Sequence, residues 1–277
     1  MSNSVANFFR WIVFALAAFA LNYPVISTLS AAFKTSAEIS RSPGLWVHAP
    51  TLDNFAVVLE ITERLNIYFY LQNSLIASLI GSILPIVLCF PMAYLIARRG
   101  YGIHIIFPIV VNLRAMPLII FAIPLYMMYQ TVGLLDTALG LGLILAIVNL
   151  PIALLLLLNA IDDVPKELDE AARMDGAQIF AIVGQVTLPI CLPALTTVFI
   201  ISFITAWNEF LFGLMLTTTD AVPMTVGASF FFSSGGGGVQ WGVAAAVIVV
   251  ASLPPVIIGL LMYKHISRSM IAGAVKG

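Results

Sequence analysis

The sequence has very little charge. Only 9% of its 277 residues are Asp, Glu, Lys or Arg, whereas 61% are hydrophobic, and the mean hydropathy is +1.06. Soluble domains carry about 25% charged residues, and their surfaces need polar cover. The composition therefore excludes a water-soluble fold and predicts an integral membrane protein. The net charge of −1 gives no basic surface for nucleic acid.

Reactive and metal-ligating side chains are also scarce. The two cysteines, Cys89 and Cys191, lie in apolar runs and are predicted to be small core residues. His48, His104 and His265 are isolated, whereas a metal site needs converging ligands. No glycine-rich run is followed by Gly-Lys-Ser/Thr, and no Ser/His/Asp or Cys/His group can be assembled. The chain is therefore expected to have no ATPase of its own, no catalytic site, no bound cofactor and no metal.

What the sequence has in abundance is long apolar runs. A helix needs about 20 apolar residues to cross a bilayer. Six runs meet this length: 11–33, 70–97, 105–129, 138–161, 190–216 and 243–263. We therefore predict an all-α, polytopic bundle of six transmembrane helices forming one domain over residues 1–277. Prolines inside the runs are expected to kink the helices: Pro117, Pro124, Pro151, Pro254 and Pro255.

The Lys and Arg residues predict the orientation, because loops on the cytoplasmic side carry the excess of positive charge. With a cytoplasmic N-terminus, eight of the twelve lie on that side: Arg10, Arg98, Arg99, Lys166, Arg173, Lys264, Arg268 and Lys276. Three lie on the opposite side, and Arg114 falls inside a span. Both termini are then cytoplasmic. Segments 34–69, read as turns with one short helix, and 217–242 are outer loops.

One cytoplasmic stretch, "ELDEAARMDG" at 167–176, gathers much of the charge. Asp163 and Pro165 suit a helix start, and Gly176 suits a helix end with left-handed backbone. Asp169 and Arg173 can pair at the i, i+4 spacing. We therefore predict a short helix here.

A second short helix is predicted over 177–186, before the fifth span begins near Pro189.

Leu168, Ala171 and Ala172 share one face of the first helix at helical spacing. Small residues let a partner's groove approach the backbone, so this helix is a candidate docking element. The alternative is a solvated loop that only maintains topology. The cytoplasmic segment as a whole covers 162–189.

The segment "EAARMDGAQIFAIVGQVTLP" at 170–189 resembles the cytoplasmic signature of ATP-binding-cassette importer permeases. The signature reads Glu-Ala-Ala, three residues, Gly, nine residues, Ile, one residue, Leu-Pro. This chain departs from it only at Val186, where Ile is usual. The stretches "RAMPLIIFAIPLYMMYQTVGLLDT" (114–137) and "LPALTTVFIISFITAWNEFLFGLMLT" (192–217) resemble the maltose-type, carbohydrate-importing branch.

This resemblance implies a permease subunit in a bacterial or archaeal inner membrane. The implied partners are a second permease, giving a heterodimer, a cytoplasmic ATPase dimer that binds ATP and Mg, an extracytoplasmic solute-binding protein, and membrane lipid. The residues that would couple to the ATPase are Glu167, Glu170, Ala171, Ala172, Arg173, Asp175, Gly176, Leu188 and Pro189. The cargo would be a sugar. One alternative is that the same machine carries an amino acid or polyamine. Another is a self-contained membrane protein such as a channel or an intramembrane enzyme.

Residues inside the spans give candidates for the solute pathway. Arg114 and Glu209 are charged, and intramembrane charges usually face a bundle interior or a water-filled cavity. Asn208 and Glu209 either line a sugar pathway or bond neighbouring helices. Trp207 suits sugar stacking, but aromatic residues in spans also serve simple packing.

The outer loop 217–242 contains the run "SSGGGG". Glycine brings no side-chain bulk to a close contact. By resemblance, Gly235, Gly236, Gly237 and Gly238 would contact the solute receptor. The alternative is a slack connector.

Overall fold

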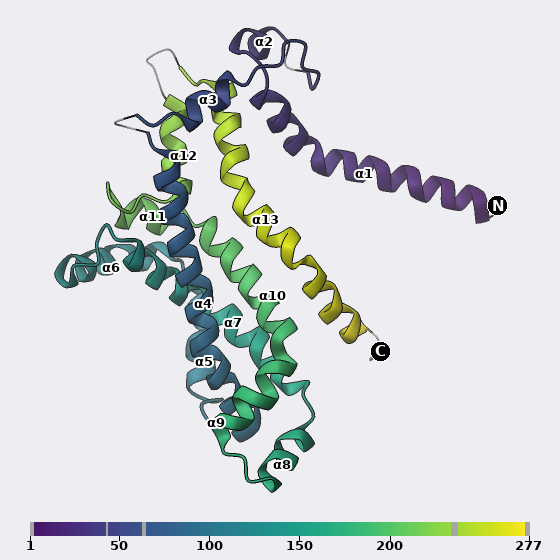
Figure 1. Cartoon of the computed structure of the whole chain (residues 1–277), viewed down its shortest axis with the longest axis vertical. Helices are drawn as coiled ribbons and strands as arrows, with labels where there is room; N and C mark the ends of the chain where they lie inside the picture. The colour runs from purple at the N-terminus through teal and green to yellow at the C-terminus, as the bar shows by residue number, and fades with distance from the viewer. Residues whose placement is uncertain (1–2, 43, 63–64, 234–237, 275–277) are drawn as a thin grey trace. The chain divides into compact units, whose positions relative to one another are not determined.

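The structure, a computed structural model, describes residues 3–42, 44–62, 65–233 and 238–274. All regular secondary structure in these ranges is helical, which confirms the predicted all-α class (Figure 1). The helices form two compact units, one made of residues 1–67 and 227–253 and the other of residues 68–226 and 254–277.

Five of the described helices are long and apolar enough to cross a membrane, or six if one bent pair counts as a single span. The five are α1 (Asn3–Ala32), α4 (Ile67–Arg99), α7 (Ala138–Asp162), α10 (Leu188–Trp207) with the turns before it, and α13 (Trp241–Ala274). This agrees with a polytopic membrane protein.

The bent pair occupies the predicted run 105–129, which is not one continuous helix. It consists of α5 (Ile106–Asn112), η1 (Leu113–Ala115) and α6 (Ile119–Val132). The part formed by α5 and η1 makes a bend of 108° with α6. Pro117 lies at the break, and Met116 before it has extended backbone. A proline disfavours helical backbone at the preceding residue and has no N–H of its own. The break therefore follows from local chemistry.

The fifth span also differs from its prediction. α10 ends at Trp207, and a separate short helix, α11 (Leu211–Leu216), follows. The predicted second short helix is not separate either. Instead, α9 (Ile179–Ala181) and the π-helical segment η2 (Ile182–Thr187) run directly into α10. Pro189 lies in the first turn of α10, where a proline is tolerated, so it does not break the helix.

The second unit is built on the packing of α4, α7 and α10, which lie along one another (Figure 1). The buried Asn149 on α7 ties them together, because its Nδ2 donates to the carbonyls of Gly81 on α4 at 2.9 Å and Ser202 on α10 at 3.0 Å. A Cβ added to Gly81 would lie 2.8 Å from the Cβ of Leu145. The helices thus approach at a small residue, as in many membrane bundles.

Hydrogen bonds to a single carboxylate join the turn between α6 and α7 to the segment after α11. Asp136, with a φ of 54°, accepts hydrogen bonds from the backbone N–H groups of Thr218, Thr219, Asp220 and Ala221 at 2.9–3.1 Å. The Thr218 hydroxyl donates a further one at 2.7 Å. Burial raises the pKa of Asp136, but these donors outweigh it and lower the pKa to about 2. The carboxylate therefore fixes the conformation of this loop.

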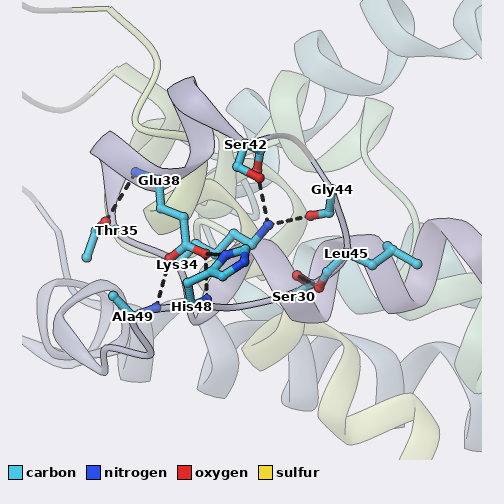
Figure 2. A network of polar contacts seen from close by, with 9 residues as sticks. All are labelled: Ser30, Lys34, Thr35, Glu38, Ser42, Gly44, Leu45, His48 and Ala49. Carbon is cyan, nitrogen blue, oxygen red and sulfur yellow. Dashed lines mark hydrogen bonds and ion pairs between the residues drawn. The ribbon is translucent and has the colours of Figure 1, made fainter.

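In the first unit, α1 is followed by two short helices, α2 (Ser36–Arg41) and α3 (Asp53–Leu59), where one was predicted. Figure 2 shows the polar network that holds α2 and the chain that follows it. The buried Lys34 donates from Nζ to the carbonyls of Ser42 and Gly44. Glu38 accepts from the backbone N–H of His48 at 2.7 Å and contacts its Nδ1 at 3.1 Å. The segment 34–69, predicted to be an outer loop, is therefore folded in its described part.

The predicted loop 217–242 also contains helical structure. It includes α12 (Met224–Phe230) and the 3-10 turn η3 (Phe231–Ser233). The first residues of α12 are fixed within the second unit, because the backbone N–H of Met224 donates to Ser74 Oγ on α4 at 2.7 Å.

Candidate functional site

The charged stretch forms the short helix α8 (Lys166–Met174), preceded by Pro165. Figure 1 shows it in the connection between α7 and α10, at the end of these helices opposite to α11. The helix ends in a Schellman motif: the N–H of Gly176 donates to the carbonyl of Arg173 at 3.0 Å, and that of Ala177 to Ala172 at 2.9 Å. Gly176 has the predicted left-handed backbone, with a φ of 84°.

Both the inward and the outward face of α8 mix polar and apolar residues. An acidic residue, Asp169, faces inward and is only 2% exposed, and Ala172 packs against a buried core cluster. Apolar residues face outward: Leu168 is 41% exposed and Met174 is 88% exposed. Phe180, just beyond the helix, is 87% exposed. An amphipathic helix that exposes its apolar residues presents a surface suited to a partner.

Asp169 is buried because it has partners on another helix. Its Oδ2 accepts from Arg98 Nε at 2.9 Å and from the Tyr94 hydroxyl at 3.0 Å, both on α4. Arg98 also donates to the carbonyl of Val164 at 2.8 Å. The predicted pairing of Asp169 with Arg173 is thus wrong, because Asp169 turns toward α4 and pairs with Arg98.

The predicted coupling residues lie mostly on the exposed surface of the segment 166–189. Ala172 is half-buried, and the others are exposed: Glu167, Glu170, Ala171, Arg173, Asp175, Gly176, Leu188 and Pro189. We call the exposed residues Glu167, Leu168, Glu170, Ala171 and Met174 the outer face of α8. The sequence analysis missed Met174, although Leu168, Ala171 and Met174 follow at three-residue intervals, which is a helical stripe.

Among the pathway candidates, Arg114 lines a cavity. It lies in η1, at the break of the bent pair, and is exposed. The cavity has a volume of about 510 Å³, which is within the range of small-molecule sites. Its walls include Phe121, Ile144, Thr205 and Phe212, so the cation stands in largely apolar surroundings.

The other three pathway candidates do not line this cavity. Trp207 is 3% exposed and stacks on Phe203 with ring centroids 5.8 Å apart. Asn208 donates from Nδ2 to the carbonyl of Ile204 in its own helix at 2.9 Å. The carboxylate of Glu209 accepts the backbone N–H of Phe212 at 2.9 Å. These contacts make Glu209 a cap for α11 and Trp207 a packing residue in this chain.

Three of the four predicted receptor-contact residues, Gly235, Gly236 and Gly237, lie outside the described residues. Gly238 is described, exposed and has a φ of 96°. Its backbone is therefore in a region that other residues rarely adopt.

Comparison with known proteins places this geometry in context. Residues 89–272 match the model of the family described as "Binding-protein-dependent transport system inner membrane component". The trehalose/maltose transport system permease protein of Thermococcus litoralis is 30% identical over 92% of this chain and 91% of its own. The sulfoquinovosyl glycerol transport system permease protein of Agrobacterium fabrum is 28% identical over 92% of this chain and 89% of its own.

A solved structure shares the fold. It is that of a bacterial ABC transporter involved in the import of the acidic polysaccharide alginate, with a TM-score of 0.78. The match covers 95% of this chain and 97% of the other at 20% sequence identity.

Proposed function

We propose that this chain, which belongs to the family of inner membrane components of binding-protein-dependent transport systems, is a permease subunit of an ATP-driven sugar importer whose helix α8 docks on a cytoplasmic ATPase. The observation that carries this proposal is the outer face of α8. It exposes Leu168 and Met174 together with the carboxylates of Glu167 and Glu170.

A helix of this kind suits a groove on a soluble partner. Apolar side chains of such size are costly to leave in water, at about 25 cal/mol per Å². In helix-in-groove recognition, residues spaced along one helical face supply the anchors. Leu168, Ala171 and Met174 supply that stripe, and Glu167 and Glu170 add exposed carboxylates to the outer face of α8. The inward face of α8 is meanwhile held by the permease core, so the docked helix is not free to turn.

The mechanism we propose is rigid-body transmission. ATP and Mg bind to an ATPase dimer, whose closure displaces α8 of this chain and the corresponding helix of a second permease, the two forming a heterodimer. The spans then rock between inward-facing and outward-facing arrangements. A solute-binding protein delivers the solute from outside. Glycines 235–238 contact this binding protein. This chain itself hydrolyses nothing and binds no cofactor or metal.

The solute we propose is a sugar or sugar derivative. The two curated relatives, named for trehalose/maltose and sulfoquinovosyl glycerol transport, support this class. Within this chain, Arg114 is the pathway candidate that borders a cavity. The contacts of Trp207 and Glu209 favour structural roles for both.

The orientation we propose puts both termini and residues 162–189 in the cytoplasm, on the distribution of Lys and Arg. Single-cysteine labelling from each side of the membrane tests it. A label that reaches position 176 only from outside would contradict both the orientation and the docking.

The decisive experiment is reconstitution. The tagged chain is purified with its partners from native membranes, placed in proteoliposomes, and given the receptor with a panel of neutral sugars, acidic sugars, amino acids and polyamines. We expect ATP turnover and uptake to rise together with one or more sugars. Stimulation by an amino acid or polyamine alone would contradict the sugar assignment, and solute flux without ATP would contradict the importer.

A further inference from the structure

A buried ion pair joins α8 to a helix far away in the sequence. Arg98, at the end of α4, and Asp169, in the middle of α8, meet at 2.9 Å, and each side chain is 3% exposed. The two residues are 71 positions apart, so no local preference of the chain brings them together. The Tyr94 hydroxyl, one turn earlier on α4, donates to the same Asp169 oxygen at 3.0 Å.

The pair is poorly explained as a device for stability. Burying two charges carries a desolvation penalty, and replacing such a pair by apolar side chains is often neutral or stabilising. The penalty is not fully offset here, because Asp169 Oδ1 and Arg98 Nη1 are buried without a hydrogen-bond partner among the described residues. What directional hydrogen bonds supply better than apolar packing is a fixed relative orientation.

The contacts restrain α8 at more than one point. Arg98 Nη2 holds the carbonyl of Val164, which precedes the helix, while its Nε holds Asp169 within the helix. Near the C-terminal end, Ala172 and Ala177 pack on the buried cluster of α4, α7 and α10 side chains. The helix is thus attached to α4 as well as to its two chain neighbours.

We propose that Arg98, Asp169 and Tyr94 are positioning residues that make α8 and the end of α4 one rigid body, so that a displacement of α8 passes directly into α4. This inference rests on the proposed function, in which α8 is the helix that the ATPase moves. We call these contacts of Arg98, Asp169 and Tyr94 the lock. Without the lock, α8 would still be connected to α7 and α10 through the chain. It could then rotate against α4, and part of its displacement would not reach α4.

The lock itself is tested without any partner. Spin labels are placed on α8 and α4 through Ala171→Cys and Leu95→Cys, in the full-length chain with Cys89 and Cys191 replaced by alanine, in lipid nanodiscs. We expect one narrow distance distribution. The double variant Arg98→Met, Asp169→Leu, which keeps the site filled with apolar side chains, should widen it at least twofold without lowering the unfolding temperature appreciably.

Arg99→Met is the matched control, because Arg99 is the neighbouring charge on α4 and is exposed. It should leave the distribution unchanged. A double variant with a distribution as narrow as the wild type would overturn the lock, and so would an equal widening in the control.

Transmission is then measured in the unlabelled complex as the ATP hydrolysed per solute imported. We expect this ratio to rise severalfold in the double variant, less in Tyr94→Phe, and not in Arg99→Met. A normal ratio in the double variant would overturn the transmitting role. A wild-type complex without receptor-stimulated ATP turnover would instead contradict the proposed function, while the distance measurement still decides the lock.

Discussion

At the scale of single residues, Gly176 shows a requirement of the backbone alone. Its φ is 84°, but a Cβ added to it would meet no atom within 4 Å. Left-handed backbone costs a non-glycine residue about 1–2 kcal/mol. We therefore expect Gly176→Ala to lower the free energy of unfolding by about that amount, measured by denaturant titration in detergent. Gly176→Val should do so more strongly and also weaken ATPase docking and uptake.

Gly184 provides the control for this substitution. It lies in η2, also with open space around its Cα, but without the left-handed backbone. Gly184→Ala should therefore be neutral or slightly stabilising. Equal losses in the two alanine variants would show that strain is not the cause.

Asp136 leads to a prediction about pH. Its folded pKa, about 2, lies below the ordinary value of 3.8. A group with a lowered folded pKa contributes stability that is fully present above the unfolded pKa and is lost as the pH falls through the folded pKa. This contribution should thus be constant at neutral pH and disappear between about pH 4 and pH 2.

The substitution Asp136→Asn should remove part of that acid dependence. It keeps the tolerance for a positive φ but replaces acceptor oxygen by an NH₂ group that cannot accept the N–H bonds of residues 218–221. We expect a loss of about 1–3 kcal/mol at pH 7, measured by thermal unfolding over a pH series. Asp220→Asn changes the charge equally at an exposed side chain and should have little effect. A pH profile unaffected by Asp136→Asn would contradict the assignment.

Which residues could be predicted depended on how far away their partners lie. The helix end at Gly176 was predictable because a left-handed cap is set by neighbouring residues. The partner of Asp169 was not, because Arg98 is 71 positions away and the local i, i+4 rule pointed to Arg173. For Glu209 the sequence left a pathway and a structural role open, and the structure shows its carboxylate bonded to N–H groups three and four residues further on, in α11.

At the scale of elements, substitutions on the outer face of α8 can impair docking without impairing folding. Met174 is 88% exposed, so Met174→Ser removes little from the permease's own core. We expect it to reduce the ATPase recovered with the tagged chain severalfold at an unchanged unfolding temperature. Glu170→Lys should act similarly by reversing a charge in the contact. Ile61→Ser, at a 65% exposed apolar residue outside the segment, should leave ATPase recovery normal.

The crossing of α4 with α7 and α10 is a second element-level prediction. A Cβ on Gly81 would lie 2.8 Å from Leu145 Cβ and 3.2 Å from Ala206 Cβ, and neither neighbour is a flexible chain end. Gly81→Ala should therefore destabilise the chain by about 1–3 kcal/mol through overpacking. Gly259→Ala, with nothing within 4 Å, should not. A harmless Gly81→Ala would mean that the helices separate more easily than the packing indicates.

The spans themselves were largely predictable, and their irregularities were not. Length and hydropathy located every apolar run, because the bilayer imposes both. Pro117 indicated a kink in the third run, but it did not indicate that the bend would be as large as 108°. Hydropathy also does not indicate that α10 ends at Trp207 or that Glu209 bonds to the first turn of α11.

At the scale of the whole molecule, the composition of the chain contrasts with that of helix α8. A chain with 9% charged residues concentrates charge in a short helix that buries an aspartate and exposes methionine and leucine. Family membership places such a chain in the inner membrane as part of a transport system that depends on a binding protein. The central claim is that the outer face of α8 is where the ATPase binds.

The most direct measurement of this claim is site-specific photo-crosslinking in native membranes. A benzophenone amino acid replaces Met174 in one chain and the exposed Tyr101, outside α8, in a second, and adducts are identified by mass spectrometry. The account predicts that position 174 yields an adduct with an ATP-binding-cassette ATPase subunit and that position 101 does not. Adducts at position 174 only with lipid or with this chain itself, while an ATPase is present in the same membranes, would contradict it.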